Sequence, residues 1–366
     1  MSPRIAELRL ARWLGPWTLE TEWPRHTRRS AVTIAGPMER IDARIYRPSR
    51  GAPMASVLLL PGLHYLGPDD PRLDRFARVL AEAGKLVFAP FLPDSLRLVV
   101  RPQVIDDARA AFEALLRLTD RPSGKPGIVS ISFGSLPALH ITASDLGDEV
   151  GQLVTFGGYA DFGSSVRFAL RGGVALDNSP ANRPHDPLNR PVVFMNLLDH
   201  FEDLPPDVDR VMAHWRRYVW ATWGRQEMKQ GRFREVAARM EGDLAGDALR
   251  LYRQGCGTAP GGDERCERAL QRGKTGLAWL DSDVPAKQTR CPVTVVHGRD
   301  DDVIPYEQSE QLADLIPGDP SVHLTGLYAH SGKPRLRDLL QMLPAAGGEL
   351  WSMLQIVRAF AALGEG

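Results

Sequence analysis

Residues 126–135 read PGIVSISFGS, and the interpretation of this stretch decides which fold the sequence predicts. The apolar run over residues 128–131 indicates a buried strand that stops at Ser132, and a helical pattern follows to about His140. A serine on a sharp strand-to-helix turn is strained and exposed above the sheet, and its neighbours two positions away must be small. Ser130 and Gly134 meet that requirement. The stretch therefore predicts either an ordinary polar turn or a turn that presents Ser132 as a nucleophile.

Short apolar runs alternate with helical patterns on both sides of this stretch. Such alternation implies right-handed crossovers and a mainly parallel, twisted sheet covered by helices on both faces, which is an α/β fold. The expected strands lie at residues 31–34, 41–46, 56–60, 86–91, 128–131, 152–156, 292–296 and 322–324.

The stretch between the fourth and fifth buried strands differs from the rest. It is helical and aromatic, with one apolar run, residues 192–197, that is ambiguous between strand and helix. We therefore expect a helical insertion whose ends leave and re-enter at the carboxyl ends of the strands. The predicted division is an N-terminal extension (1–30), a first part of the core (31–176), a helical cap (177–290) and a second part of the core (291–366).

Composition and charge exclude several classes of protein. In the 366 residues, 45 Lys and Arg balance 45 Asp and Glu, so no overall charge favours nucleic acid or an anionic membrane. Charged residues interrupt the first 17 positions, and no apolar stretch is long enough to span a membrane, so the expected location is cytoplasmic. Cys256 and Cys266 lie close enough in sequence to pair, but two free thiols are expected in a reducing cytosol. No metal-binding pattern occurs, so no metal or cofactor is expected.

Two further stretches carry candidate catalytic residues. Residues 295–305, VVHGRDDDVIP, follow an expected strand and precede a helix, and the flanking Gly298 and Pro305 favour a functional acid over a solvated acidic turn. Residues 325–331, TGLYAHS, place His330 in a loop after the last expected strand. His323 is the rival histidine, but it lies inside that strand.

In these three stretches the chain resembles the α/β-hydrolase family. Residues 130–134, SISFG, are similar to the family's G-x-S-x-G turn, with Ser130 in place of the first glycine. The family's acid loop, G-x-x-D-x-x-[VI]-P, aligns its acid with Asp301, between Asp300 and Asp302. The order of Ser132, Asp301 and His330 is the order expected for this fold. The resemblance covers roughly residues 30–175 and 290–345.

The resemblance implies a role for each of these residues. His330 would accept the proton of Ser132, while Asp301 fixes its tautomer and stabilises its cation. The backbone N–H groups of Phe133 and Leu63 would form the oxyanion hole, with Gly62 permitting the close approach. His64 and Tyr65 are expected to border the pocket, although His64 is equally compatible with a structural histidine. Ser130 and Ser135 are rival hydroxyls, and Asp161, after the strand at 152–156, is an alternative acid.

These roles predict a serine hydrolase that cleaves a carboxylic ester through an acyl-enzyme on Ser132. Thioesters, lactones and amides use the same apparatus. The aromatic residues of the cap favour a small substrate with an apolar acyl or alcohol group, or else they form the core of the cap; they are Trp215, Tyr218, Trp220 and Trp223. Two other functions stay open: an acyltransferase that uses the same triad, and a non-catalytic binding scaffold.

Overall fold

The central feature of the molecule is an eight-stranded sheet. The computed structural model describes residues 3–15, 18, 21–172, 185–326 and 346–364 of the 366. The strands are β1 (Thr27–Ala35), β2 (Arg40–Pro48), β3 (Ala55–Leu60), β4 (Lys85–Pro90), β5 (Gly127–Ile131), β6 (Gln152–Phe156), β7 (Val293–Gly298) and β8 (Ser321–Thr325). Their order is β1-β2-β4-β3-β5-β6-β7-β8. Only the β1–β2 and β2–β4 pairs are antiparallel, so the predicted mainly parallel sheet is confirmed.

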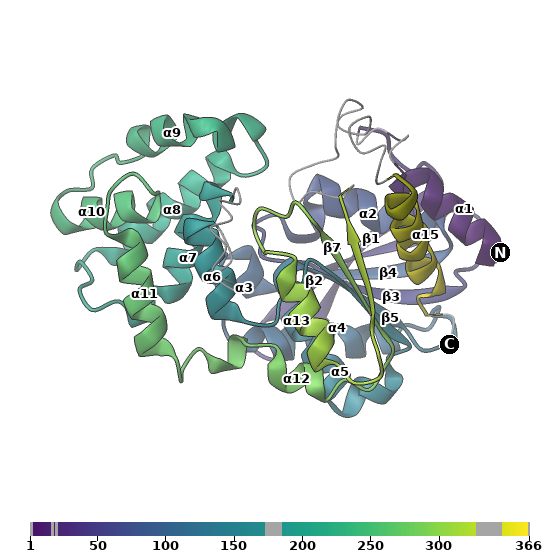
Figure 1. Cartoon of the computed structure of the whole chain (residues 1–366). Helices are drawn as coiled ribbons and strands as arrows, with labels where there is room; N and C mark the ends of the chain where they lie inside the picture. Colours follow the sequence, from purple (N-terminus) through teal and green to yellow (C-terminus); the bar gives the residue numbers. More distant parts are fainter. Residues whose placement is uncertain (1–2, 16–17, 19–20, 173–184, 327–345, 365–366) are drawn as a thin grey trace.

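Helices cover both faces of the sheet (Figure 1). One face packs against α1 (Pro3–Leu14), α2 (Pro71–Glu82) and α15 (Ala346–Ala362), and the other against α4 (Gln103–Leu116), α5 (Ser135–Ala143), α12 (Asp283–Lys287) and α13 (Glu307–Leu315). Successive side chains of a strand point to opposite faces, so Val57 and Leu59 of β3 join the first layer, and Leu58 and Leu60 the second. The central strands are therefore mostly apolar along their whole length, as expected for a sheet buried on both sides.

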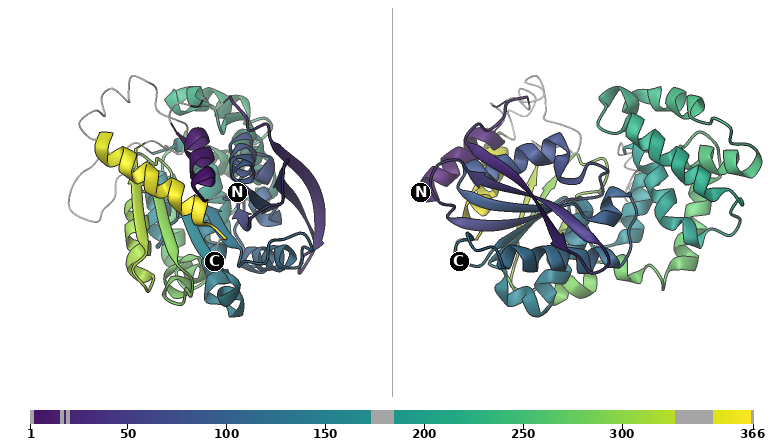
Figure 2. Two further views of the ribbon diagram at one scale, coloured as in Figure 1. Left: turned by 90° about the vertical axis from the view of Figure 1, so that its right-hand side faces the viewer. Right: turned by 180° about the vertical axis from the view of Figure 1, so that it is seen from behind.

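The two ends of the described chain pack together on one face. Helix α1 buries Leu10 and Trp13 beside α2 and α15, and Figure 2 shows α1 and α15 side by side from a second direction. Cys256, Cys266 and Cys291 are buried free thiols. Among the described residues, every helix is too short or too polar to cross a membrane.

Between β6 and β7 the chain forms a separate group of helices to one side of the sheet (Figure 1). We name residues 162–172 and 185–273 the helical insertion; it contains α6 (Phe162–Arg171), α7 (Arg190–Leu197), α8 (Val208–Thr222), α9 (Phe233–Arg239), α10 (Gly246–Gly255) and α11 (Gly262–Gly273). These helices share a core of their own, which includes Phe194, Trp215 and Tyr252.

The ambiguous run at residues 192–197 belongs to α7 and is helical. Most of its side chains are buried, including Val192, Phe194 and Leu197. A short helix buried on most sides reads as a continuous apolar run, which periodicity cannot separate from a strand.

Candidate active site

Ser132 stands at the point where β5 meets the following helix. It begins a short 3-10 turn, η2 (Ser132–Gly134), that leads into α5. Its φ is +52°, in the left-handed region that non-glycine residues seldom adopt and that is retained where the surrounding structure imposes it. The Ser132 side chain is half-buried, whereas Ser130 and Ser135 are completely buried. Of these three hydroxyls, Ser132 alone is open to a substrate.

Glycines allow the loop after β3 to pack directly on this turn. A Cβ at Gly134 would lie 2.7 Å from the carbonyl oxygen of Pro61 and 2.8 Å from that of Leu60. A Cβ at Gly62 would lie 3.1 Å from the Cβ of Ser132 and 3.7 Å from its Oγ. Because backbone atoms meet here, neither position has room for a side chain without a shift of the main chain.

We expect Gly134→Ala to lower the free energy of unfolding by about 1–3 kcal/mol, the usual range for an overpacked site. Gly163→Ala is the matched control, because the added Cβ would meet the ends of side chains and no backbone atom: Nη1 of Arg167 at 3.3 Å and Oδ1 of Asp161 at 3.6 Å. Chemical denaturation monitored by circular dichroism measures both variants. Equal stabilities of Gly134→Ala and wild type would show that the turn does not need a glycine.

Two backbone N–H groups belong to the segments that meet at Ser132. Phe133 is the second residue of η2, and the first N–H groups of a helical turn have no acceptor inside it. The N–H of Leu63 has no acceptor among the described residues, and Leu63 directly follows the glycine that contacts Ser132. Their position suits the stabilisation of an oxyanion formed at Ser132.

Asp301 lies at the same edge of the sheet, in the loop after β7. Its side chain is almost fully buried, and Oδ1 accepts hydrogen bonds from the N–H groups of Val303 (2.8 Å) and Ile304 (2.9 Å). Its neighbours differ: Asp300 is exposed, and Asp302 forms an ion pair with Lys229. Of the three consecutive aspartates, Asp301 is the one whose carboxylate is almost fully buried and is held by backbone N–H groups of its own loop.

The carboxyl end of β6 separates Ser132 from Asp301. Because β6 lies between β5 and β7, the two residues are about two strand spacings, or 10 Å, apart. Gly157 and Gly158 follow β6, so no side chain of these two residues fills the gap, and a Cβ at Gly157 would lie 3.6 Å from Oδ2 of Asp301. One imidazole with a hydrogen bond on each side can span most of such a gap.

The histidine predicted to occupy this gap, His330, lies outside the described residues. The rival, His323, is inside β8, where it pairs in register with Val296, and partial burial lowers its pKa. Asp161, the alternative acid, accepts a hydrogen bond from the N–H of Ser164 at 2.5 Å and caps the start of α6. It therefore has a structural role at the helix start.

The structure adds one residue to which the sequence assigned no role, His297. It is completely buried at the end of β7, with Nε2 2.9 Å from the carbonyl oxygen of Ile304 and 3.3 Å from Oδ2 of Asp301. Its Nδ1 lies 2.5 Å from the hydroxyl of Ser309 on α13. Since both nitrogens are engaged, His297 holds the Asp301 loop in place and is not available as the base for Ser132. A histidine four residues before the acid was the only signal in the sequence.

His64 and Tyr65 lie where the core meets the helical insertion. Nδ1 of His64 accepts the N–H of Leu66 (3.2 Å), Nε2 lies 3.3 Å from Oδ2 of Asp70, and burial lowers the pKa of His64. These contacts brace the loop that carries Leu63.

The four aromatic residues of α8 and its end divide into two pairs. Trp215 and Tyr218 are completely buried in the core of the insertion. The ring of Tyr65 lies 5.4 Å from that of Trp220 and 6.4 Å from that of Trp223, between centroids. Trp220 and Trp223 therefore turn toward the loop that follows β3.

Comparison with known proteins gives a likeness in structure alone. A scan against models of protein families finds no match, and a search of curated proteins finds none either. Among solved structures, the chain is similar to brefeldin A esterase, a bacterial homologue of human hormone-sensitive lipase, at a TM-score of 0.51 and 14% identity, over 99% of this chain and 86% of that one. The chain has the α/β-hydrolase fold.

Other matches to solved structures, two peptidases among them, have TM-scores below 0.5. One is an acylaminoacyl peptidase of Pyrococcus horikoshii (TM-score 0.48, 12% identity), of which this chain covers 43% while 93% of this chain is matched. The other is a puromycin-hydrolysing peptidase of Mycobacterium tuberculosis (TM-score 0.47, 15% identity; 93% of this chain, 40% of that one). The chain spans about two fifths of the length of either peptidase.

Proposed function

We propose that this protein is a serine hydrolase that cleaves carboxylic esters through an acyl-enzyme on Ser132. The observation that carries the proposal is the accessible hydroxyl of Ser132 on a strained turn, at φ +52°, with buried Asp301 at the same edge of the sheet. An alcohol is a poor nucleophile near neutral pH and needs a base and oxyanion donors beside it. A strained turn has a function when it presents the serine hydroxyl to such groups. The similarity in fold to brefeldin A esterase favours an ester over other acyl bonds.

The proposed reaction has two halves. Ser132 Oγ attacks the ester carbonyl carbon while His330 takes its proton, and the N–H groups of Phe133 and Leu63 stabilise the oxyanion. The carbon–oxygen bond to the alcohol breaks, and His330 protonates the departing alkoxide. Water, deprotonated by His330, then attacks the acyl carbon, the bond from that carbon to Ser132 Oγ breaks, and His330 returns the proton to Oγ, which releases the acid and restores Ser132. Asp301 orients His330 and stabilises its cation throughout.

A panel of ester, thioester and amide substrates tests the proposal, with the Ser132→Ala variant run beside the wild type. The proposal requires ester hydrolysis by the wild type that is lost in Ser132→Ala. Added alcohol in the same reactions distinguishes hydrolysis from acyl transfer by its products. A wild type that turns over none of the three classes supports the non-catalytic scaffold instead.

We expect the substrate to carry an apolar group, because Tyr65 and the exposed Trp220 lie next to the loop that carries Leu63. For nitrophenyl esters, kcat/KM should then rise with acyl length, by up to about fourfold per buried methylene. Trp220→Ala should flatten this rise, whereas Trp351→Ala, which removes an equally exposed tryptophan of α15, should not. A flat or falling response in the wild type contradicts the expected preference.

A further inference from the structure

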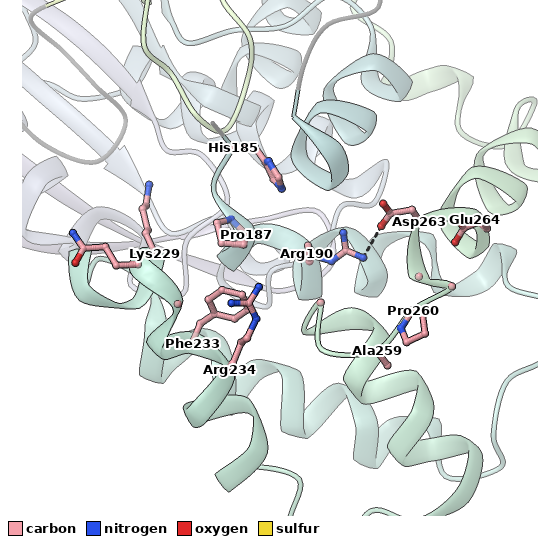
Figure 3. Close-up of a pocket in the computed structure, with 15 residues that line it drawn as sticks. His185, Pro187, Arg190, Lys229, Phe233, Arg234, Ala259, Pro260, Asp263 and Glu264 are labelled. Carbon is pink, nitrogen blue, oxygen red and sulfur yellow. Dashed lines mark ion pairs between the residues drawn. The ribbon is translucent and has the colours of Figure 1, made fainter. Parts of the chain in front are cut away.

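Three charged side chains join the helical insertion to the loop that carries Asp301. Lys229 belongs to η6 (Met228–Arg232), just before α9. Its Nζ lies 2.8 Å from Oδ2 of Asp186 and 2.5 Å from Oδ2 of Asp302. The three side chains are between 11% and 19% exposed. Lys229 also lines a cavity of about 690 Å³ in the helical insertion (Figure 3).

The junction is continued by the main chain. The N–H of Asp186, in the segment before α7, donates to the carbonyl oxygen of Asp302 at 2.7 Å. Asp302 is the immediate neighbour of Asp301, and the N–H groups of the next two residues hold the Asp301 carboxylate. A displacement of Asp302 would therefore carry the carboxylate of Asp301 with it.

The charges at this junction depend on Lys229. Two carboxylates share one ammonium group, and Oδ1 of Asp302 is buried with no hydrogen-bond partner among the described residues. Burial lowers the pKa of Lys229, but the two carboxylates outweigh it and hold that pKa above its usual value. Burial also raises the pKa of Asp302, against the opposing effect of Lys229. Without the ammonium group, two poorly solvated carboxylates would repel each other.

We propose that Lys229 is a positioning residue for catalysis. It fixes residues 299–305 against the helical insertion, so that the carboxylate of Asp301 is held in position to orient His330. This inference rests on the proposed function of Asp301 and adds a residue that lies in the insertion, outside the triad and the oxyanion hole. The geometry of the catalytic acid then depends on how the insertion is docked.

The first test is the kinetics of Lys229→Met. A misplaced catalytic group can cost about 100-fold in rate, so we expect kcat to fall by about that factor while KM changes little. Lys287→Met is the matched control, because it breaks an exposed ion pair with Asp283 (3.2 Å) on α12 and should keep the wild-type kcat. Lys229→Arg, which keeps the charge, should recover most of the lost rate.

The second test is the pH profile of the ratio of the kcat of Lys229→Met to that of wild type. Burial raises the pKa of Asp302, and its protonation would relieve the repulsion in the variant, so the ratio should rise as the pH falls. Wild type and variant share the other charged groups that influence this pair or its neighbours, so the ratio isolates the pair. These other groups are Asp300, Asp301, His185 and Arg190. A side chain that served only to fill space would give a constant ratio.

The third test needs no activity. Hydrogen–deuterium exchange of the peptide spanning 299–305 should be faster in Lys229→Met than in wild type or Lys287→Met. If Lys229→Met does not fold, the double variant Lys229→Met/Asp302→Asn should restore folding and slow exchange, because one carboxylate has been removed. If the wild type turns over no substrate of the panel, the proposed function is refuted. The hydrogen–deuterium exchange rates would still show whether Lys229 holds residues 299–305 in place. Wild-type kcat and exchange in Lys229→Met, or no recovery in the double variant, overturns the inference.

Discussion

Replacement of Ser132 by alanine is expected to lower the kcat of ester hydrolysis by about 10⁶-fold, the scale seen when a serine nucleophile is removed. The acyl-enzyme cannot form without its hydroxyl, and the two neighbouring serines in the described part of the chain are not placed to substitute for it. Ser130 and Ser135 lie within three residues, but both are fully buried. Initial rates with a nitrophenyl ester measure the loss.

Ser135→Ala is the control for this variant. Its hydroxyl has no hydrogen-bond partner among the described residues, so its removal should leave both activity and stability close to those of wild type. A large loss in Ser135→Ala together with an active Ser132→Ala would indicate that Ser135 is the nucleophile. That result would contradict the assignment of Ser132.

Asp301→Asn is expected to lower kcat by about 10⁴-fold, as when an amide replaces the acid of a triad and leaves the histidine in the wrong tautomer. The amide is the same size as the carboxylate, and its oxygen can still accept the N–H groups of Val303 and Ile304. We therefore expect a much larger effect on kcat than on KM or on the free energy of unfolding.

Asp300→Asn separates the candidate acids, because Asp300 is exposed and next to Asp301. It should retain kcat within a few-fold of wild type. If Asp300→Asn loses activity and Asp301→Asn does not, the acid has been placed one residue too late in the loop.

The central sheet could be predicted because its strands carry their own signal. β3, β5 and β6 are buried on both faces, so each reads as a short, nearly continuous apolar run between turn residues. The turn at Ser132 was predictable for a similar reason: two small residues at fixed spacing are a local requirement of the backbone. The structure then shows what Gly134 accommodates, which is the close approach of the carbonyl oxygens of Pro61 and Leu60.

Features made by distant parts of the chain were not predictable. Lys229 and Asp302 are 73 residues apart, and no local pattern relates a lysine in a helical segment to an acid loop. The contact of His297 with Ser309 depends on how α13 packs on β7. The aromatic residues of α8 look alike in sequence, and only the packing of the insertion separates buried Trp215 from exposed Trp220.

The most direct measurement is the site of labelling by a fluorophosphonate probe, which reacts with an activated serine hydroxyl and is located by mass spectrometry of peptides. We predict one labelled peptide in the wild type, with the modification on Ser132, and no labelling of Ser132→Ala. A wild type that resists the probe, or equal labelling of the two proteins, would contradict the assignment of Ser132 as an activated nucleophile.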